Sequence, residues 1–339
     1  MMRAYGPRMS RTNTAHPAAR RAFHALHHAS DGPLLLPNAW DVASAVALAD
    51  AGYAAVGTTS LGVAASQGYP DGRGLAGVRE ATLALARRLG GRLPCPYTVD
   101  IEGGYGDEDG GDQAAERATG RAADQAAERV AALAAELASA GAAGVNLEDG
   151  LPGGGGLQLP SRQAELIAAV KERVPGLFLN ARIDTHWLVD TPPPLSATLA
   201  RAEVYLEAGA DGVFVPGVVA DEEIAALVAA VPAPVNILFA PGRHTVGRLA
   251  ELGVRRISTG SLLFRTALGA ALAAAESVRM GEGTMREGVA REDAAGEGVT
   301  ECDIPASGIP TGGTPASGIP GYAEVQRLME PLRENGPLG

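Results

Sequence analysis

The feature that most constrains the fold of this chain is a repeated alternation of short apolar runs and longer Ala/Leu-rich stretches. Eight runs predict strands, and they cover residues 34–37, 54–58, 96–100, 144–148, 177–183, 212–215, 235–239 and 256–259. Runs that are apolar throughout are typical of strands buried on both faces, as in parallel sheets. The stretches between them have the helical period, with Val130, Leu133 and Leu137 on one face.

Eight strand–helix units in about 240 residues favour an α/β fold of the TIM type, a (β/α)8 barrel, over an open doubly wound sheet. No Gly-x-Gly-x-x-Gly motif follows the first strand, which removes the main sign of a dinucleotide-binding fold. We therefore expect residues 31–280 to form a barrel catalytic domain, preceded by an N-terminal segment or helix over residues 1–30.

The C-terminal part has a different composition. Residues 281–321 are rich in Gly, Pro and Glu, and Pro-Ala-Ser-Gly-Ile-Pro occurs at 305–310 and again at 315–320. Such a segment buries too little apolar surface to offset its ordering entropy, so we expect a flexible Gly/Pro-rich extension. A short helix within residues 322–339 follows, with Val325, Leu328 and Leu332 on one face. It can dock on the barrel or on another subunit.

Composition narrows the class of protein and of partner. A formal net charge of −11 argues against nucleic acid or an anionic membrane as partner. No apolar run of 18 residues predicts a membrane span. Two cysteines make no disulfide framework, so we expect a reduced, cytoplasmic protein. Lys171, the one lysine, is expected mid-helix and facing solvent, which disfavours Schiff-base chemistry.

Three carboxylates mark the predicted carboxyl ends of neighbouring strands, where active sites of such barrels lie. Asp100 and Glu102 are two residues apart and share one face of an extended strand, and Glu148 ends the next strand. Converging carboxylates suit a hard divalent cation, Mg²⁺ or Mn²⁺, with several waters retained. The alternative is that these acids cap the following helices or pair with an arginine.

Other polar residues fall at the same edge. Arg182 projects from the fifth strand and can hold a carboxylate or phosphate through two hydrogen bonds, or else pair with Glu148 or Asp184. His186 can act as an acid or base near neutral pH, or be a loop histidine without a catalytic role. The remaining candidate substrate ligands are the turn Thr59, Ser60, Leu61 and Gly62, which offers hydroxyl and backbone N–H groups, and Asn236 of the seventh strand.

Taken together, residues 36–41, 57–60, 99–106, 145–149 and 180–184 resemble the isocitrate lyase/phosphoenolpyruvate mutase superfamily. The resemblance covers about residues 30–275 and keeps the order of the motifs. It implies a barrel that binds Mg²⁺ and an α-oxo carboxylate and that cleaves or forms C–C or P–C bonds. It also implies a homo-oligomer, a dimer or tetramer, often with a terminal helix exchanged between subunits.

The resemblance assigns roles to individual residues. Asp100 matches the direct metal ligand, Glu102 stands where the family usually has a second Asp, and Glu148 matches the metal-site glutamate. Arg182 matches the substrate-binding arginine. The turn at residues 59–62 matches the loop that binds the substrate carboxylate.

One departure from the family concerns the loop at residues 151–160. The lyases carry a Lys-Lys-Cys-Gly-His gate at this point, and the mutases carry a loop with lysine and asparagine. This loop contains no Cys, Lys or His, so it cannot supply the usual proton donor. Any protonation would come from water, Tyr105 or His186.

These observations predict a Mg²⁺-dependent carbon–carbon lyase or decarboxylase that acts on a small 2-oxo or 2-hydroxy carboxylic acid through a metal-bound enolate. One alternative is a phosphoenolpyruvate or phosphonopyruvate mutase or hydrolase. Another is a non-catalytic barrel that binds a metabolite.

Overall fold

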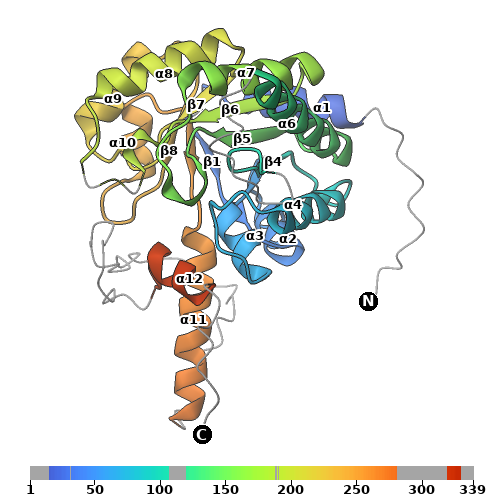
Figure 1. Cartoon of the computed structure of the whole chain (residues 1–339). Coiled ribbons are helices and arrows are strands. Elements are labelled where there is room, and N and C mark those ends of the chain that lie inside the picture. Colours follow the sequence, from blue (N-terminus) through green and yellow to red (C-terminus); the bar gives the residue numbers. More distant parts are fainter. Residues whose placement is uncertain are drawn as a thin grey trace, which may run out of the picture.

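Nine short parallel strands surround one axis in the computed structural model of the chain, which describes residues 15–30, 32–106, 120–187, 189, 191–280 and 319–329 (Figure 1). The strands are β1 (Leu34–Leu36), β2 (Asn38–Ala39), β3 (Val56–Thr58), β4 (Tyr97–Asp100), β5 (Gly144–Glu148), β6 (Phe178–Arg182), β7 (Gly212–Phe214), β8 (Val235–Leu238) and β9 (Arg256–Ser258). Their order is β1-β9-β8-β7-β6-β5-β4-β3-β2, and helices lie outside them. The predicted (β/α)8 barrel is confirmed.

The seam of the barrel lies at Pro37. The sequence predicts one strand over residues 34–37, but the structure has two, because proline has no N–H to donate to a ladder. β1 pairs with β9 and β2 pairs with β3, so the chain changes neighbours at the proline. Asn38 joins the two sides, since its Nδ2 donates to the Thr58 carbonyl at 2.7 Å and its Oδ1 accepts from the Thr259 N–H at 3.0 Å.

Helices follow the strands and cover the outside of the barrel (Figure 1). They are α1 (Ala15–Leu26), α2 (Val42–Asp50), α3 (Ser60–Ser66), α4 (Ala76–Leu89), α6 (Gly120–Ala140), α7 (Pro160–Arg173), α8 (Leu195–Glu207), α9 (Asp221–Ala230), α10 (Val246–Glu251), α11 (Leu262–Arg279) and α12 (Tyr322–Leu328), with short 3₁₀ turns η1 (Pro152–Gly154) and η2 (Asp184–His186). The faces they turn to the strands are apolar; for example, Leu133 and Leu137 of α6 are fully buried.

The N-terminal helix α1 packs against the amino-terminal ends of the strands. Phe23 and His27 are buried with Leu36 and Phe178, and the His27 ring stacks on Phe178 at 4.0 Å between centroids. Burial lowers the pKa of His27 to about 3, so the imidazole is neutral. This packing leaves the carboxyl ends of the strands as the open side of the barrel.

Three further expectations have an outcome here. The prediction that Lys171 faces solvent is wrong, because its Nζ donates to Asp211 at 2.6 Å and to the Leu177 carbonyl at 3.0 Å. The predicted flexible extension lies outside the described residues apart from its end, and α12 after it docks on the barrel. Within the described part of the chain, no helix is long and apolar enough to cross a membrane.

Candidate active site

Asp100, Glu148 and Arg182 meet at the carboxyl ends of β4, β5 and β6. Glu148 and Arg182 are neighbours in the ladder register. The Arg182 guanidinium lies 2.8 Å from Glu148 Oε2 and 4.0 Å from Asp100 Oδ2 through its Nη1 atom. All three side chains are almost completely buried. Parallel strands that end at one edge bring these distant residues together, as the sequence indicated.

Arg182 is also bound to Asp184, just beyond β6. Arg182 Nε donates to Asp184 Oδ1 at 2.6 Å and Nη2 donates to Oδ2 at 3.0 Å. The Asp184 N–H in turn donates to Asp149 at 2.8 Å, and Tyr205 on α8 donates to the other oxygen of Asp149 at 2.7 Å. The Trp187 ring lies 5.4 Å from the guanidinium carbon of Arg182. The ion pairs that the sequence left open as an alternative role for Arg182 are therefore present.

Glu102 is positioned in the cluster by a turn and not by the strand that the sequence predicts. β4 ends at Asp100, so Glu102 does not lie on the strand. It adopts a left-handed conformation with φ 49°, which is uncommon for a residue with a side chain. Its N–H donates to Asp100 Oδ1 at 3.3 Å, and its Oε2 accepts from the Gly74 N–H at 3.0 Å. The turn, not strand alternation, aims this carboxylate.

Asp71 is a further member of the cluster, and the sequence argument missed it. It lies in the loop between α3 and α4, after Tyr69-Pro70, and its Oδ1 atom is buried. Its charge raises the pKa of both Asp100 and Glu102, so it lies close to them. A carboxylate in a helix–helix loop carries no strand-end signal, so the sequence pattern did not point to it.

The electrostatics of the cluster favour a cation. Burial raises the pKa of Asp100 to about 6, although Arg182 opposes the shift. Burial and then the Asp71 charge raise the pKa of Glu102 to about 8. Burial also raises the pKa of Glu148 well above its ordinary value. Carboxylates that cannot all ionise beside one guanidinium are stabilised by added positive charge.

The donor set fits a hard divalent cation. Among the residues that the structure describes, no three His, Cys, Asp or Glu side chains form a preformed metal cage. However, Glu102 Oε1 is buried without a hydrogen-bond partner, beside two further carboxylates. Mg²⁺ is held by one or two carboxylates and keeps several waters, so it does not need such a cage. Asp100, Glu102 and Glu148 would suit Mg²⁺ or Mn²⁺ in this way, with one or two of them as direct ligands and the rest bound through retained waters.

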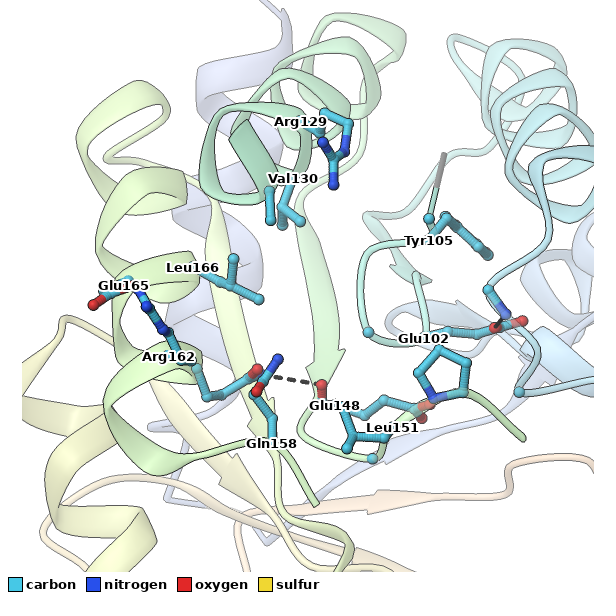
Figure 2. A pocket seen from close by; sticks show the side chains of 18 of the residues that line it. Glu102, Tyr105, Arg129, Val130, Glu148, Leu151, Gln158, Arg162, Glu165 and Leu166 are labelled. Atoms are coloured by element: carbon cyan, nitrogen blue, oxygen red, sulfur yellow. Dashed lines mark hydrogen bonds and ion pairs between the residues drawn. The ribbon is translucent and has the colours of Figure 1, made fainter. Parts of the chain in front are cut away.

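A cavity of about 150 Å³ opens beside the cluster, between α6 and α7 (Figure 2). Glu102, Glu148 and Tyr105 lie at its inner end, and Arg129 of α6 and Arg162 of α7 line it farther out. Its apolar wall is made by Ala126, Val130, Leu151, Pro152 and Leu166. A cavity of this volume holds a ligand of about benzene size.

Tyr105 lines this cavity, and its ring runs from the lining toward α4 (Figure 2). It has a left-handed backbone with φ 60°, and its hydroxyl lies 3.0 Å from the hydroxyl of Thr82 on α4. Burial, reinforced by the Glu102 charge, raises the pKa of Tyr105 well above its ordinary value. The phenol therefore keeps its proton at neutral pH.

Asp100, Arg182 and the other predicted site residues do not line this cavity. The turn at residues 59–62 is buried where α3 begins, and the Ser60 side chain favours the ionised form of Asp71. Asn236 lies inside the barrel, where its Oδ1 accepts from the Ser258 hydroxyl at 3.1 Å. His186 is buried, with Nδ1 3.0 Å from the Thr185 hydroxyl. A substrate-binding or catalytic role for these residues stays a prediction.

The loop after β5 closes one side of the cavity. The Leu151 N–H donates to the Gly156 carbonyl at 2.8 Å, which makes a small hairpin. The Gly153 N–H donates to the Gly72 carbonyl at 2.8 Å and ties the hairpin to the Asp71 loop. The loop thus shapes the cavity with its backbone and with Leu151 and Pro152, and not with reactive side chains.

Comparison with known proteins agrees with this geometry. The sequence profile of the phosphoenolpyruvate phosphomutase family matches residues 23–279. An uncharacterised protein of Mycobacterium tuberculosis (strain H37Rv) is 44% identical over 266 residues, which are 77% of this chain and 90% of that protein. The 2-methylisocitrate lyase of Bacillus subtilis (strain 168) is 28% identical over 209 residues, covering 59% of this chain and 61% of the lyase.

Solved structures share the fold. A protein of Burkholderia cenocepacia J2315, provisionally assigned as a phosphonomutase, is 37% identical with a TM-score of 0.67, covering 76% of this chain and 99% of its own. Phosphonopyruvate hydrolase, in complex with oxalate and Mg²⁺, is 20% identical with a TM-score of 0.64, covering 81% of this chain and 92% of its own. The chain therefore belongs to the phosphoenolpyruvate phosphomutase family, within the isocitrate lyase/phosphoenolpyruvate mutase superfamily of lyases, mutases and hydrolases.

Proposed function

We propose that this protein is a Mg²⁺-dependent carbon–carbon lyase or decarboxylase that acts on a small 2-oxo or 2-hydroxy carboxylic acid. The observation that carries the proposal is the set of buried carboxylates around Arg182 at the carboxyl ends of the strands, two of which, Glu102 and Glu148, line a cavity. The lyase relative and the relative solved with oxalate and Mg²⁺ support it.

In this proposal, Asp100, Glu102 and Glu148 hold the divalent cation. A bound cation stabilises negative charge that develops on the oxo and carboxylate oxygens of the substrate. Arg182 binds the substrate carboxylate through its guanidinium, whose contact with Glu148 is then exchanged for the substrate. Asp184 keeps the guanidinium oriented through its two hydrogen bonds.

Tyr105 is the proposed proton donor. When the C–C bond breaks, its electron pair passes to the oxo oxygen as an enolate and the second fragment leaves. A proton must then reach the carbon of the broken bond. Tyr105 lines the cavity, and its hydroxyl, 3.0 Å from that of Thr82, is protonated at neutral pH, so in this proposal it donates through a water.

Oxalate resembles the enolate of pyruvate in shape and charge, so calorimetry of oxalate binding tests the site. We expect wild-type protein to bind oxalate in Mg²⁺ and not in EDTA. Asp100→Asn should weaken this binding by at least about tenfold, because it removes a ligand charge. Asp50→Asn, at the exposed end of α2, is the matched control and should bind as wild type does. Binding that is absent, or equal with and without Mg²⁺, would contradict the proposal.

A second candidate is P–C bond chemistry on phosphoenolpyruvate or phosphonopyruvate. It is favoured by Arg129 and Arg162, two cationic residues that line the cavity and that a phosphoryl group would require. Phosphorus NMR of the two compounds with the Mg²⁺-loaded protein separates the candidates. Conversion of one into the other, or release of inorganic phosphate, would favour the second.

We also propose that the protein forms a homo-oligomer through α11. This helix leaves the barrel (Figure 1), and among its described residues only Gly269 is buried. Leu272 and Val278 are 60% and 71% exposed. An apolar helix surface of this kind is stabilised when a second copy of the chain covers it.

A further inference from the structure

The C-terminal helix α12 docks on the barrel beside the candidate site, 255 residues along the chain from its contact at Asp71. Val325 of this helix is 1% exposed. Pro320, just before the helix, is buried, and its carbonyl accepts from Arg265 of α11 at 3.1 Å. The helix therefore has a defined docking position on the barrel.

Two side chains of α12 bind Asp71. Tyr322 donates its hydroxyl proton to Asp71 Oδ2 at 2.8 Å. The Gln326 amide forms a pair of bonds with the Asp71 backbone, since its Oε1 accepts from the N–H at 2.9 Å and its Nε2 donates to the carbonyl at 3.0 Å. Gln326 Nε2 also donates to the Tyr322 hydroxyl at 3.1 Å. Asp71 is thus held through both its side chain and its main chain.

Tyr322 also reaches the opposite side of the site. Its ring meets the Trp187 ring edge-on at 5.6 Å between centroids. The same Trp187 ring lies 5.4 Å from the guanidinium carbon of Arg182. One side chain of α12 therefore links the Asp71 loop to the residue that packs on the proposed substrate-binding arginine.

The loop that α12 holds is part of the carboxylate cluster. Three residues after Asp71, the Gly74 N–H donates to Glu102 Oε2 at 3.0 Å. The Gly72 carbonyl accepts from Gly153 of the loop after β5 at 2.8 Å. A displacement of residues 71–74 would therefore move Glu102 and the loop that walls the cavity.

We propose that α12 completes the site, with Tyr322 and Gln326 as positioning residues that hold Asp71 and its loop in the arrangement that binds a divalent cation and an oxo acid. This inference rests on the proposed function of the same site. The C-terminal segment is then needed for binding and not only for stability. A protein in which α12 has detached from the barrel would remain folded but would bind the cation and the oxo acid more weakly.

The test uses full-length Tyr322→Phe and Gln326→Ala proteins, with Leu328→Ala as the matched control, because Leu328 is on the same helix and 60% exposed. Oxalate binding in Mg²⁺ is measured by calorimetry and the melting temperature by calorimetric scanning. We expect each of the first two variants to bind oxalate about tenfold more weakly, the effect of losing a hydrogen bond to a charged or main-chain partner. Leu328→Ala should match wild type, and the melting temperatures should agree within a few degrees.

Tryptophan fluorescence reports whether α12 is docked against Trp187, independently of any ligand. In a Trp40→Phe background, Trp187 is the remaining tryptophan. Acrylamide should quench it more strongly in Gln326→Ala than in the parent, whereas Tyr322→Phe keeps the ring contact and should quench as the parent does. Wild-type protein that fails to bind oxalate in Mg²⁺ would overturn the proposed function. Wild-type binding that both α12 variants retain unchanged would overturn this inference alone.

Discussion

At the scale of single residues, the site is an excess of buried carboxylates that share one guanidinium. Asp100 and Glu102 have pKa values of about 6 and about 8, far above the usual value near 4. Each group is stabilised in the folded protein when protonated, so its contribution is complete below pH 4 and is lost as the pH rises through the folded value. A bound cation would lower the free-energy cost of ionising these two buried carboxylates.

We therefore expect the metal-free protein to lose stability between about pH 4 and pH 8, the window set by these two groups. The melting temperature in EDTA, scanned across this range, is the measurement. Glu102→Gln should flatten the upper part of the curve, and 10 mM Mg²⁺ should raise the melting temperature most near pH 8. A melting temperature that stays constant or rises from pH 6 to pH 8 in EDTA would contradict this account.

At the scale of elements, close packing decides where the predicted anion-binding turn lies. A Cβ at Gly62 would be 2.7 Å from the Trp40 Cβ and 2.8 Å from Thr59 Cγ2, and 3.4 Å from the Phe264 Cβ of α11. The start of α3 can approach Trp40 this closely only because residue 62 has no side chain. The turn at residues 59–62 is consequently buried where the start of α3 packs against Trp40.

Gly62→Ala should destabilise the protein by about 1–3 kcal/mol, the usual cost of overpacking a buried contact. Urea denaturation followed by circular dichroism measures this free energy. Gly247→Ala is the control, since Gly247 lies within α10 and a Cβ there would meet nothing within 4 Å. That change should be neutral or stabilising by up to about 1 kcal/mol, because alanine favours a helix. Equal effects of the two substitutions would show that the contact of α3 with Trp40 does not constrain residue 62.

At the scale of the whole molecule, α11 and α12 differ in how they lie relative to the barrel. α12 packs on the Asp71 loop beside the site, whereas α11 leaves the barrel (Figure 1) and exposes Leu272 and Val278. If a second copy covers α11, a charge placed there should separate the subunits, since an unpaired charge is costly in an apolar interface.

We expect Leu272→Glu to reduce the mass measured by light scattering after gel filtration from that of an oligomer to that of one chain. Val246→Glu is the matched control, because Val246 is also exposed, at 41%, but lies on α10. A monomeric wild-type protein, or a Leu272→Glu protein of unchanged mass, would show that α11 is not the interface.

The sequence by itself determined the barrel and the central residues of the site. Periodic apolar runs specify strands and helices locally, and eight such units close in one way, so that Asp100, Glu148 and Arg182 at strand ends must meet. The split of the first strand could be predicted only in part. Pro37 shows where the ladder ends, but the pairing of β1 with β9 and of β2 with β3 depends on how the barrel closes.

Only the tertiary structure decided the rest of the site. Asp71 lies in a helix–helix loop, Glu102 is aimed by a left-handed turn, and Tyr322 arrives from the far end of the chain. None of these positions follows a period, because loop conformation and docking depend on contacts between segments distant in sequence. Asn236 and His186 make buried hydrogen bonds with Ser258 and Thr185, which depend on how neighbouring segments pack, and their role in the site stays a prediction.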